Sequence, residues 1–330
     1  MSIHIERWIK SDTTTAGRHD VVDMRDRVAE RNSLGTLDFL CERSLGFGKT
    51  PLRKLVSDLS GRWGILMSGR GIELGAGAGF LGVAILQLNS SVEQLLSLEI
   101  SERHVEEVML RAAGECLGEE IRRFRPVIGS FDDILLEDNE LDFAVQINSL
   151  HHSNDLDVTL KEVVRVLKPG GLLVCLDRSH PDFVSDQDIE IMLSLQYQDE
   201  ALQRIGFPSG TKYTRADNGE HEYRDQEWKD YAQRAGLTVE LFERIGVSFS
   251  VKKVLRGLLA RSPDFVFKIL LLINPSLAKT FGRRKYLPRR GELAYQFKLL
   301  LRRKYTFERE ITLMVFRKPG DKSMSKFGED

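Results

Sequence analysis

The stretch Arg70-Gly71-Ile72-Glu73-Leu74-Gly75-Ala76-Gly77-Ala78-Gly79-Phe80 constrains the fold more than any other part of the chain. A short apolar run meets three alternating glycines, and an apolar run with helical spacing follows, which predicts a strand, a tight turn and a helix. Glycines in such a turn let a ligand approach the main chain, and the helix N-terminus offers N–H groups to it. We therefore expect a bound ligand here, with a purely structural turn as the alternative.

The spacing of the glycines bears on which ligand this is. The dinucleotide fingerprint G-x-G-x-x-G requires a glycine where this chain has Phe80, because the third glycine comes one residue early, at Gly79. The E-x-G-x-G-x-G arrangement instead resembles the S-adenosylmethionine loop of class I methyltransferases.

Length and composition favour an ordinary α/β protein. The chain has 330 residues, 42% of them hydrophobic, and a net charge of −1, which gives no overall attraction for nucleic acid. Its three cysteines have no metal-ligand spacing, so we expect no metal site and a reducing compartment. There is no signal-peptide pattern at the start and no apolar run of about 18 residues, so a cytoplasmic protein is predicted.

Beyond the glycine stretch, apolar runs of strand length alternate with helical patterns, which predicts a parallel sheet covered by helices. The expected strands are 71–74, 95–100, 124–128, 141–147, 172–176, 237–242 and 310–316. The expected helices between them are 80–88, 101–117, 155–167 and 227–235.

The same pass along the chain suggests four parts. Residues 1–60 read as a polar arm followed by a helical cap, and residues 61–245 as the α/β core. Residues 246–307 form a helical insertion rich in Lys and Arg, and residues 308–330 hold the last core strand and a polar tail.

Glu99 ends the second expected strand, beside the glycine turn. Ligands of open parallel sheets bind outside the carboxyl ends of the strands, where a carboxylate can accept both hydroxyls of a ribose. The alternative is an acid that interacts with the dipole of the next helix. A nucleoside-bearing cofactor is therefore indicated, without a choice between an S-adenosyl compound and a dinucleotide.

Later segments make that choice. The chain continues with Gly129-Ser130-Phe131-Asp132, with Asn148-Ser149-Leu150-His151-His152, and with Arg165-Val166-Leu167-Lys168-Pro169-Gly170-Gly171. In order and spacing these resemble the core of class I S-adenosylmethionine-dependent methyltransferases, over about residues 71–242 and the final strand. The resemblance implies a Rossmann-like, mostly parallel sheet of seven strands with helices on both faces and an antiparallel last strand.

The resemblance also implies a set of residues that bind S-adenosyl-L-methionine. Glu73 and the backbone of Gly75 to Gly79 would hold its methionine end, and Glu99 its ribose. Ser130 stands where similar proteins have an acid for the adenine, so Asp132, or failing that Asp133, is the expected substitute. The complete predicted set is Glu73, Gly75, Ala76, Gly77, Gly79, Glu99, Ile100, Phe131, Asp132, Asn148 and Ser149.

Methyl transfer is an in-line displacement, so the protein aligns the reactants, and a hydroxyl or amine acceptor also needs a base. The candidate bases are His151, His152, His180 and His221, although the first two follow a buried strand and fit a packing role equally. No Asn-Pro-Pro-Tyr or Asp-Pro-Pro-Tyr follows the fourth strand, which disfavours exocyclic or amide nitrogen acceptors. The expected acceptor is a small or lipid-linked molecule methylated at oxygen.

The basic insertion admits several interpretations. It is consistent with contact to an anionic membrane surface, which would place the protein at the inner face of the membrane, with a cover over the acceptor, or with a solvated lid. Nucleic acid is disfavoured because aromatic residues are sparse. Two other functions remain open, an NAD-dependent oxidoreductase and a non-catalytic, cofactor-binding scaffold at a membrane surface. The sequence leaves the oligomeric state undetermined.

Overall fold

The computed structural model of the protein describes residues 3–8, 24–30, 35–45, 48–245 and 311–320. The basic insertion predicted at 246–307 lies outside these residues, and so does the tail after residue 320.

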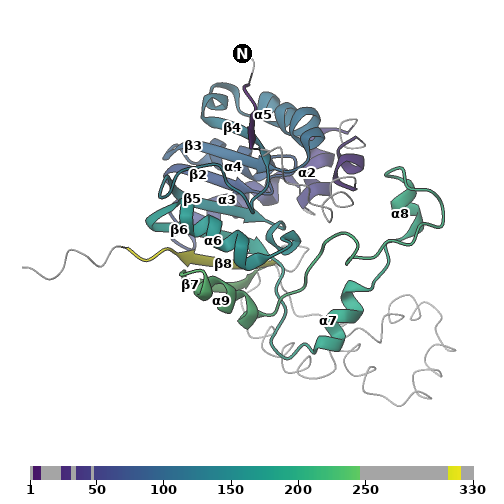
Figure 1. Ribbon diagram of the computed structural model, residues 1–330. Helices are drawn as coiled ribbons and strands as arrows, with labels where there is room; N and C mark the ends of the chain where they lie inside the picture. The colour runs from purple at the N-terminus through teal and green to yellow at the C-terminus, as the bar shows by residue number, and fades with distance from the viewer. Residues whose placement is uncertain (1–2, 9–23, 31–34, 46–47, 246–310, 321–330) are drawn as a thin grey trace, which may run out of the picture.

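A single sheet of eight strands organises the molecule, in the order β1-β4-β3-β2-β5-β6-β8-β7 (Figure 1). The strands are β1 (Glu6–Trp8), β2 (Gly69–Leu74), β3 (Val92–Glu99), β4 (Phe124–Gly129), β5 (Leu141–Ile147), β6 (Leu167–Asp177), β7 (Thr238–Ile245) and β8 (Ile311–Arg317). The α/β class and the seven predicted strands are confirmed, with boundaries that differ by a few residues.

Seven of these strands point the same way, and β8 is antiparallel to both of its neighbours, β6 and β7. The mostly parallel sheet and its antiparallel last strand are therefore as predicted. The carboxyl ends of β2, β3, β4 and β5 meet at one edge, which is where a parallel sheet binds its ligands.

The eighth strand corrects the sequence analysis, which assigned the first residues to a polar arm. β1 pairs in parallel with β4, with Glu6 opposite Val127 and Trp8 opposite Gly129. Trp8 is buried, with 7% of the residue exposed. A strand of three residues is too short to show an alternating pattern, so the sequence carried no signal for it.

Helices cover both faces of the sheet. They are α2 (Leu37–Leu45), α3 (Lys49–Gly61), α4 (Phe80–Leu88), the π-helix η1 (His104–Met109), α5 (Leu110–Cys116), the short 3₁₀ helices η2 (Gly118–Arg123) and η3 (Leu150–His152), α6 (Leu156–Val166), α7 (Asp186–Leu193), α8 (Asp199–Gln203) and α9 (Asp225–Arg234). Residues 24–30 are also helical.

The two faces bury separate hydrophobic clusters because successive strand residues point to opposite sides. On β3, Leu95 packs with α3, α4 and α5, whereas Leu96 and Leu98 pack with α6 and α9. Residues 24–30, α2 and α3 are the described helices that precede the first of the predicted strands.

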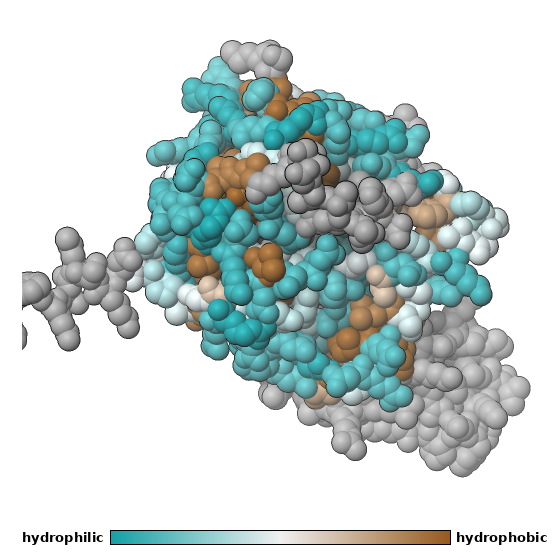
Figure 2. Space-filling view, viewed as in Figure 1, coloured by the Kyte–Doolittle hydropathy of each residue, from teal (hydrophilic) through white to brown (hydrophobic). Residues whose placement is uncertain are grey.

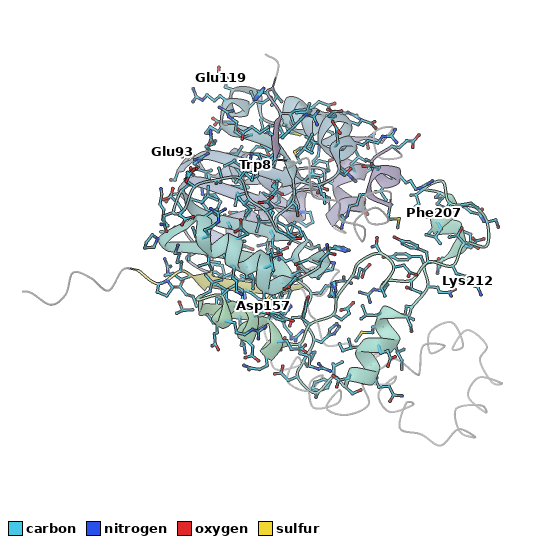
Figure 3. All side chains as sticks on the ribbon, in the orientation of Figure 1. Trp8, Glu93, Glu119, Asp157, Phe207 and Lys212 are labelled. Carbon is cyan, nitrogen blue, oxygen red and sulfur yellow. The ribbon has the colours of Figure 1, made fainter. Side chains whose placement is uncertain are left out.

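Between β6 and α9 the chain leaves the sheet and carries α7 and α8, which project to one side in Figure 1. A third hydrophobic cluster forms there, where Met24 packs against Leu202 and Ile205, with Phe207 against its edge (Figure 3). The sequence did not predict this excursion from the sheet, which we define as residues 178–224. Its residues line one side of a cavity beside the glycine turn.

The visible surface is mostly hydrophilic, with separate hydrophobic patches between the polar side chains (Figure 2). Among the described residues, no helix combines the length and the apolar character needed to cross a bilayer.

Candidate functional site

The glycine turn joins β2 to α4 as predicted. Gly75 and Gly77 have φ angles of 65° and 53°, which side chains disfavour, and Gly79 is the N-cap of α4. A Cβ on Gly75 would lie 2.5 Å from the Cβ of Ser149, so only glycine lets the turn lie against the end of β5. A Cβ on Gly77 would meet nothing within 4 Å, so this residue faces open space.

Glu99 lies at the end of β3 and reaches back to this turn. One carboxylate oxygen accepts the N–H of Gly77 at 2.7 Å, and the other accepts the N–H of Ser101 at 3.0 Å. The side chain is buried, with 3% of the residue exposed, yet it lines a cavity. Each carboxylate oxygen retains a second lone pair, so Glu99 can still accept hydroxyl groups of a ligand.

Glu73 differs from the expectation that it holds the ligand. Its carboxylate lies beneath α4, where it accepts the N–H of Gly82 at 3.1 Å and the hydroxyl of Ser97 at 2.8 Å. It lines neither of the cavities described below. Burial raises its pKa to about 8, only partly opposed by those two hydrogen bonds. We therefore assign Glu73 to fixing the start of α4.

Two cavities adjoin at the turn and share Gly75 and Arg25. The larger one holds about 350 Å³ and is mainly apolar. Its walls include Met24, Val28, Ala76, Gly77, Phe80, Ile147, Asn148, Tyr197, Leu202, Ile205 and Asn218. The smaller one lies at the ends of β3 and β4 and is lined by Glu99, Ile100, Gly129, Ser130, Phe131, Asp132, Ser149, His152 and Asn154, among others.

Most of the predicted cofactor-binding residues lie together along these two cavities. Gly75, Ala76, Gly77 and Asn148 line the larger one, and Glu99, Ile100, Phe131, Asp132 and Ser149 line the smaller one, together with Gly75. Gly79 lines neither and packs against Met109.

Like Glu99, three more of these residues have hydrogen-bond partners within the protein. Ser149 donates its hydroxyl to the carbonyl of Leu74 at 2.6 Å, and the Asp132 carboxylate accepts the hydroxyl of Thr159. Asn148 adopts a φ of 53° and donates its N–H to the carbonyl of Leu176, which fixes the end of β5.

The four candidate bases separate into different environments. His151 is buried and lies 2.6 Å, through Nδ1, from the Asp177 carboxylate, which also accepts a hydrogen bond from Gln146. Burial lowers the pKa of His151, so a neutral imidazole donates to an ionised Asp177. His151 lines neither cavity, which fits a packed, hydrogen-bonded residue.

His152 is the candidate that reaches a cavity. Its ring lies 4.2 Å from that of His151, and its Nδ1 lies 3.2 Å from the carbonyl of Asn218. Because that carbonyl only accepts, Nδ1 carries the proton and Nε2 keeps its lone pair. Burial, with Arg25 and His151 adding to it, holds the pKa of His152 well below its usual range.

His180 and His221 lie along the excursion and line neither cavity. His180 pairs with Glu222 at 2.5 Å, and His221 stacks on Tyr223 with its Nδ1 3.2 Å from the carbonyl of His151.

His180 and Glu222 belong to a half-buried charged cluster, which we define as Arg178, His180, Arg215, Glu220 and Glu222. Arg178 pairs with Glu220 at 2.9 Å and with Glu222 at 3.4 Å. Although burial opposes it, Arg178 together with Tyr197 and Arg215 lowers the pKa of Glu220 to about 2. The cluster ties the excursion to the end of β6.

Sequence reasoning missed several cavity residues. Arg25 and Met24 come from the helix at 24–30, His104 from η1, and Tyr197 and Asn218 from the excursion. Their segments show no motif, and only the folded chain brings them to the glycine turn. Within the described ranges, no group of three or more His, Cys, Asp or Glu side chains has an arrangement that could hold a metal ion.

Comparison with known proteins gives the family of the core. Residues 72–175 match the family model of the methyltransferase domain. A demethylmenaquinone methyltransferase of Staphylococcus aureus (strain MRSA252) is 27% identical over 129 residues, which are 39% of this chain and 49% of that protein. The enzyme of the same name from Staphylococcus carnosus is 35% identical over 88 residues, 27% of this chain and 34% of that protein.

The chain thus spans about half or less of the length of these curated relatives. Among solved structures, a protein assigned as a methyltransferase, in complex with the Haloferax volcanii Trm112 activator, has a TM-score of 0.50 at 16% identity. The match covers 91% of this chain and 97% of that one, and it shows a common fold. Residues 72–175 therefore match a methyltransferase domain, in agreement with the family suspected from the sequence.

Proposed function

We propose that the protein is an S-adenosyl-L-methionine-dependent methyltransferase whose acceptor is a small, largely apolar molecule. The observation that carries the proposal is the pair of cavities that adjoin at Gly75, one beside the carboxylate of Glu99 and one with apolar walls. The methyltransferase domain at residues 72–175 supports it independently.

The residues at the turn fit the cofactor. Gly77 faces open space, Glu99 retains acceptor capacity for ribose hydroxyls, and Phe131 offers an apolar ring in the same cavity. Asp132 lines this cavity as well, and we keep it as the proposed partner of the adenine amino group.

The bound cofactor would supply an electrophilic methyl group on a sulfonium. The protein's contribution is alignment and exclusion of water. Asn148, held by its backbone bond to Leu176, would border the reacting centre, and Phe80 and Ile147 would keep it apolar. His152 lines the smaller cavity, but its Nδ1 contacts the carbonyl of Asn218, a residue of the larger one, and its Nε2 lone pair is available. It is therefore the histidine that we propose as proton acceptor.

The acceptor is inferred from the walls of the larger cavity. Met24, Leu202 and Ile205 give it an apolar side, and Tyr197 and Asn218 a polar end. The relatives are named for demethylmenaquinone, a molecule of this general kind, and a lipid-linked acceptor fits the same description. We propose oxygen as the methylated atom because a neutral histidine at the site suits the deprotonation of a hydroxyl.

Isothermal titration calorimetry with S-adenosylmethionine and S-adenosylhomocysteine tests the cofactor. Binding of both at micromolar concentrations is expected, and no binding at millimolar ligand rules the proposal out. Transfer of a labelled methyl group to a hydroquinone acceptor, with product analysis by mass spectrometry, then tests the acceptor class and the methylated atom.

The same experiments separate the remaining interpretations. An NAD-dependent oxidoreductase would bind NAD(H) in place of S-adenosylmethionine. A non-catalytic scaffold would bind S-adenosylmethionine without forming methylated product from any fraction of a cell extract. The proposed contact with an anionic membrane surface falls on residues 246–307, outside the described residues, and sedimentation with anionic and neutral vesicles tests it.

A further inference from the structure

Arg25 occupies a singular place in the site. It lines both cavities, and Gly75 of the glycine turn is the only other residue in the described part of the chain that does so. Among the described residues that line either cavity, Arg25 is the only Lys or Arg, whereas Glu99 and Asp132 are the acids.

The helix that carries Arg25 is tied to the sheet. Asp26 accepts the hydroxyl of Ser101, just after β3, at 2.6 Å, and Glu30 pairs with Arg103 at 3.0 Å. On the other side, Arg27 donates to the carbonyl of Gly206 at 3.0 Å. These contacts fix residues 24–30, the helix that carries Arg25, on two sides.

The neighbouring histidines do not share its positive charge. Burial lowers the pKa of His104 and of His152, and Arg25 adds to the lowering in both cases. Both rings are therefore neutral at pH 7, which leaves a single guanidinium facing the cavities among the described residues.

The proposed ligand, S-adenosylmethionine, carries a group that a guanidinium can bind. S-adenosylmethionine carries one anionic group, the carboxylate of its methionine moiety, and an Arg binds a carboxylate through a planar pair of N–H donors. Glu99 would hold the opposite, ribose end in the smaller cavity. A ligand bound across the shared boundary at Gly75 then brings its carboxylate toward the larger cavity, where Arg25 lies.

We propose that Arg25 binds the methionine carboxylate of S-adenosylmethionine and so selects ligands that carry it. This inference rests on the proposed function and assigns a cofactor contact to a residue upstream of the methyltransferase domain.

The test compares S-adenosylhomocysteine with its decarboxylated analogue, which lacks only that carboxylate, by titration calorimetry. The wild-type protein should bind S-adenosylhomocysteine roughly 10- to 100-fold more tightly than the analogue. Arg25→Met should remove this preference by weakening the binding of S-adenosylhomocysteine alone. Arg53→Met is the matched control, because Arg53 is exposed on α3 and loses the same charge.

The outcomes distinguish the two proposals. If the wild type binds neither ligand, the proposed function fails and this inference fails with it. If the wild type binds both ligands equally, or if Arg25→Met weakens both by the same factor or neither, the role of Arg25 is overturned while the methyltransferase proposal stands. If Arg25→Met does not fold, Arg25→Lys replaces it, because lysine keeps the charge but lacks the planar pair of donors, and an undiminished preference for S-adenosylhomocysteine in that variant overturns the inference.

Discussion

At the scale of residues, the two glutamates beside the glycine turn have different roles. Both were predicted to bind the cofactor, and only Glu99 lines a cavity. Glu73 points under α4, where Gly82 leaves room for it, since a Cβ there would lie 2.5 Å from its carboxylate oxygen. The sequence shows a glycine inside a helix but not which side chain fills the space, so the two acids could not be told apart.

Glu99→Gln is expected to weaken the binding of S-adenosylhomocysteine by about tenfold or more. Glutamine has one acceptor oxygen, and the N–H groups of Gly77 and Ser101 already use both oxygens of Glu99. Calorimetry measures the loss. Glu93→Gln should leave the affinity unchanged, because Glu93 is exposed near the opposite end of the same strand, at the left edge of the molecule in Figure 3. Equal affinities for wild type and Glu99→Gln would contradict the assigned role.

Glu73 makes stability depend on pH in an unusual direction. Its pKa of about 8 in the folded protein exceeds its ordinary value of 4.5, so the folded state binds more protons between these limits. Stability from this group is present below about pH 4.5 and is lost as the pH rises toward 8.

Glu73→Gln keeps an acceptor for Gly82 and Ser97 without the titration. The gain in melting temperature of this variant over wild type should therefore grow from pH 5 to pH 8, as followed by circular dichroism. If the difference in melting temperature between Glu73→Gln and wild type stays constant across that range, Glu73 does not titrate there.

At the scale of elements, the sequence predicted the long, regular pieces and missed the short or irregular ones. The glycine turn, α4 and β5 were located because their apolar patterns are long and bounded by turn residues. α7 and α8 were missed, since α8 has five residues and its stability comes from packing on Met24, which is distant in sequence. The side of the larger cavity that Leu202 and Ile205 line could not be predicted for the same reason.

The third hydrophobic cluster should behave as a unit apart from the two clusters that flank the sheet. Leu202→Ala removes its fully buried side chain, so hydrogen exchange of residues 24–30 and 197–213 should accelerate by at least about tenfold. The melting temperature should change little. Leu160→Ala, on α6 in one of the main clusters, should instead lower the melting temperature by several degrees. A similar drop for both variants would show that the cluster is part of the core.

At the scale of the whole molecule, the half-buried charged cluster connects parts that neither the family model nor the sequence patterns relate. Arg178, one residue beyond β6, pairs with Glu220 and Glu222 at the other end of the excursion. The excursion thus leaves the sheet and returns to it at one point. Arg178 and Glu220 are 42 positions apart in the chain, and the charged residues of the cluster show no periodic pattern. The pairing of the two ends of the excursion was therefore not predictable.

Arg178→Met should destabilise the protein against acid. The depressed pKa of Glu220, about 2, contributes stability that is present above its ordinary value of 4.5 and is lost as the pH falls through 2. Without Arg178 part of that contribution disappears, and the free energy of unfolding at pH 7 should fall by about 1–3 kcal/mol.

Acid titration followed by far-ultraviolet circular dichroism should show unfolding of Arg178→Met at a higher pH than wild type. Arg234→Met serves as the comparison, because Arg234 forms an exposed pair with Asp157. Superimposable acid curves for wild type and Arg178→Met would contradict a stabilising role of the cluster.

The position of β8 between β6 and β7 has a consequence for biosynthesis. Within the described sheet, β7 pairs only with β8, which is separated from it in the chain by residues 246–310. On the ribosome, β2 to β6 can assemble in order of synthesis, whereas β7 must wait for the strand that joins it to them. At typical rates of translation this interval is on the order of seconds. During it the nascent chain presents an open sheet edge at β6, and a chaperone that shields such an edge is best suited to assist its folding.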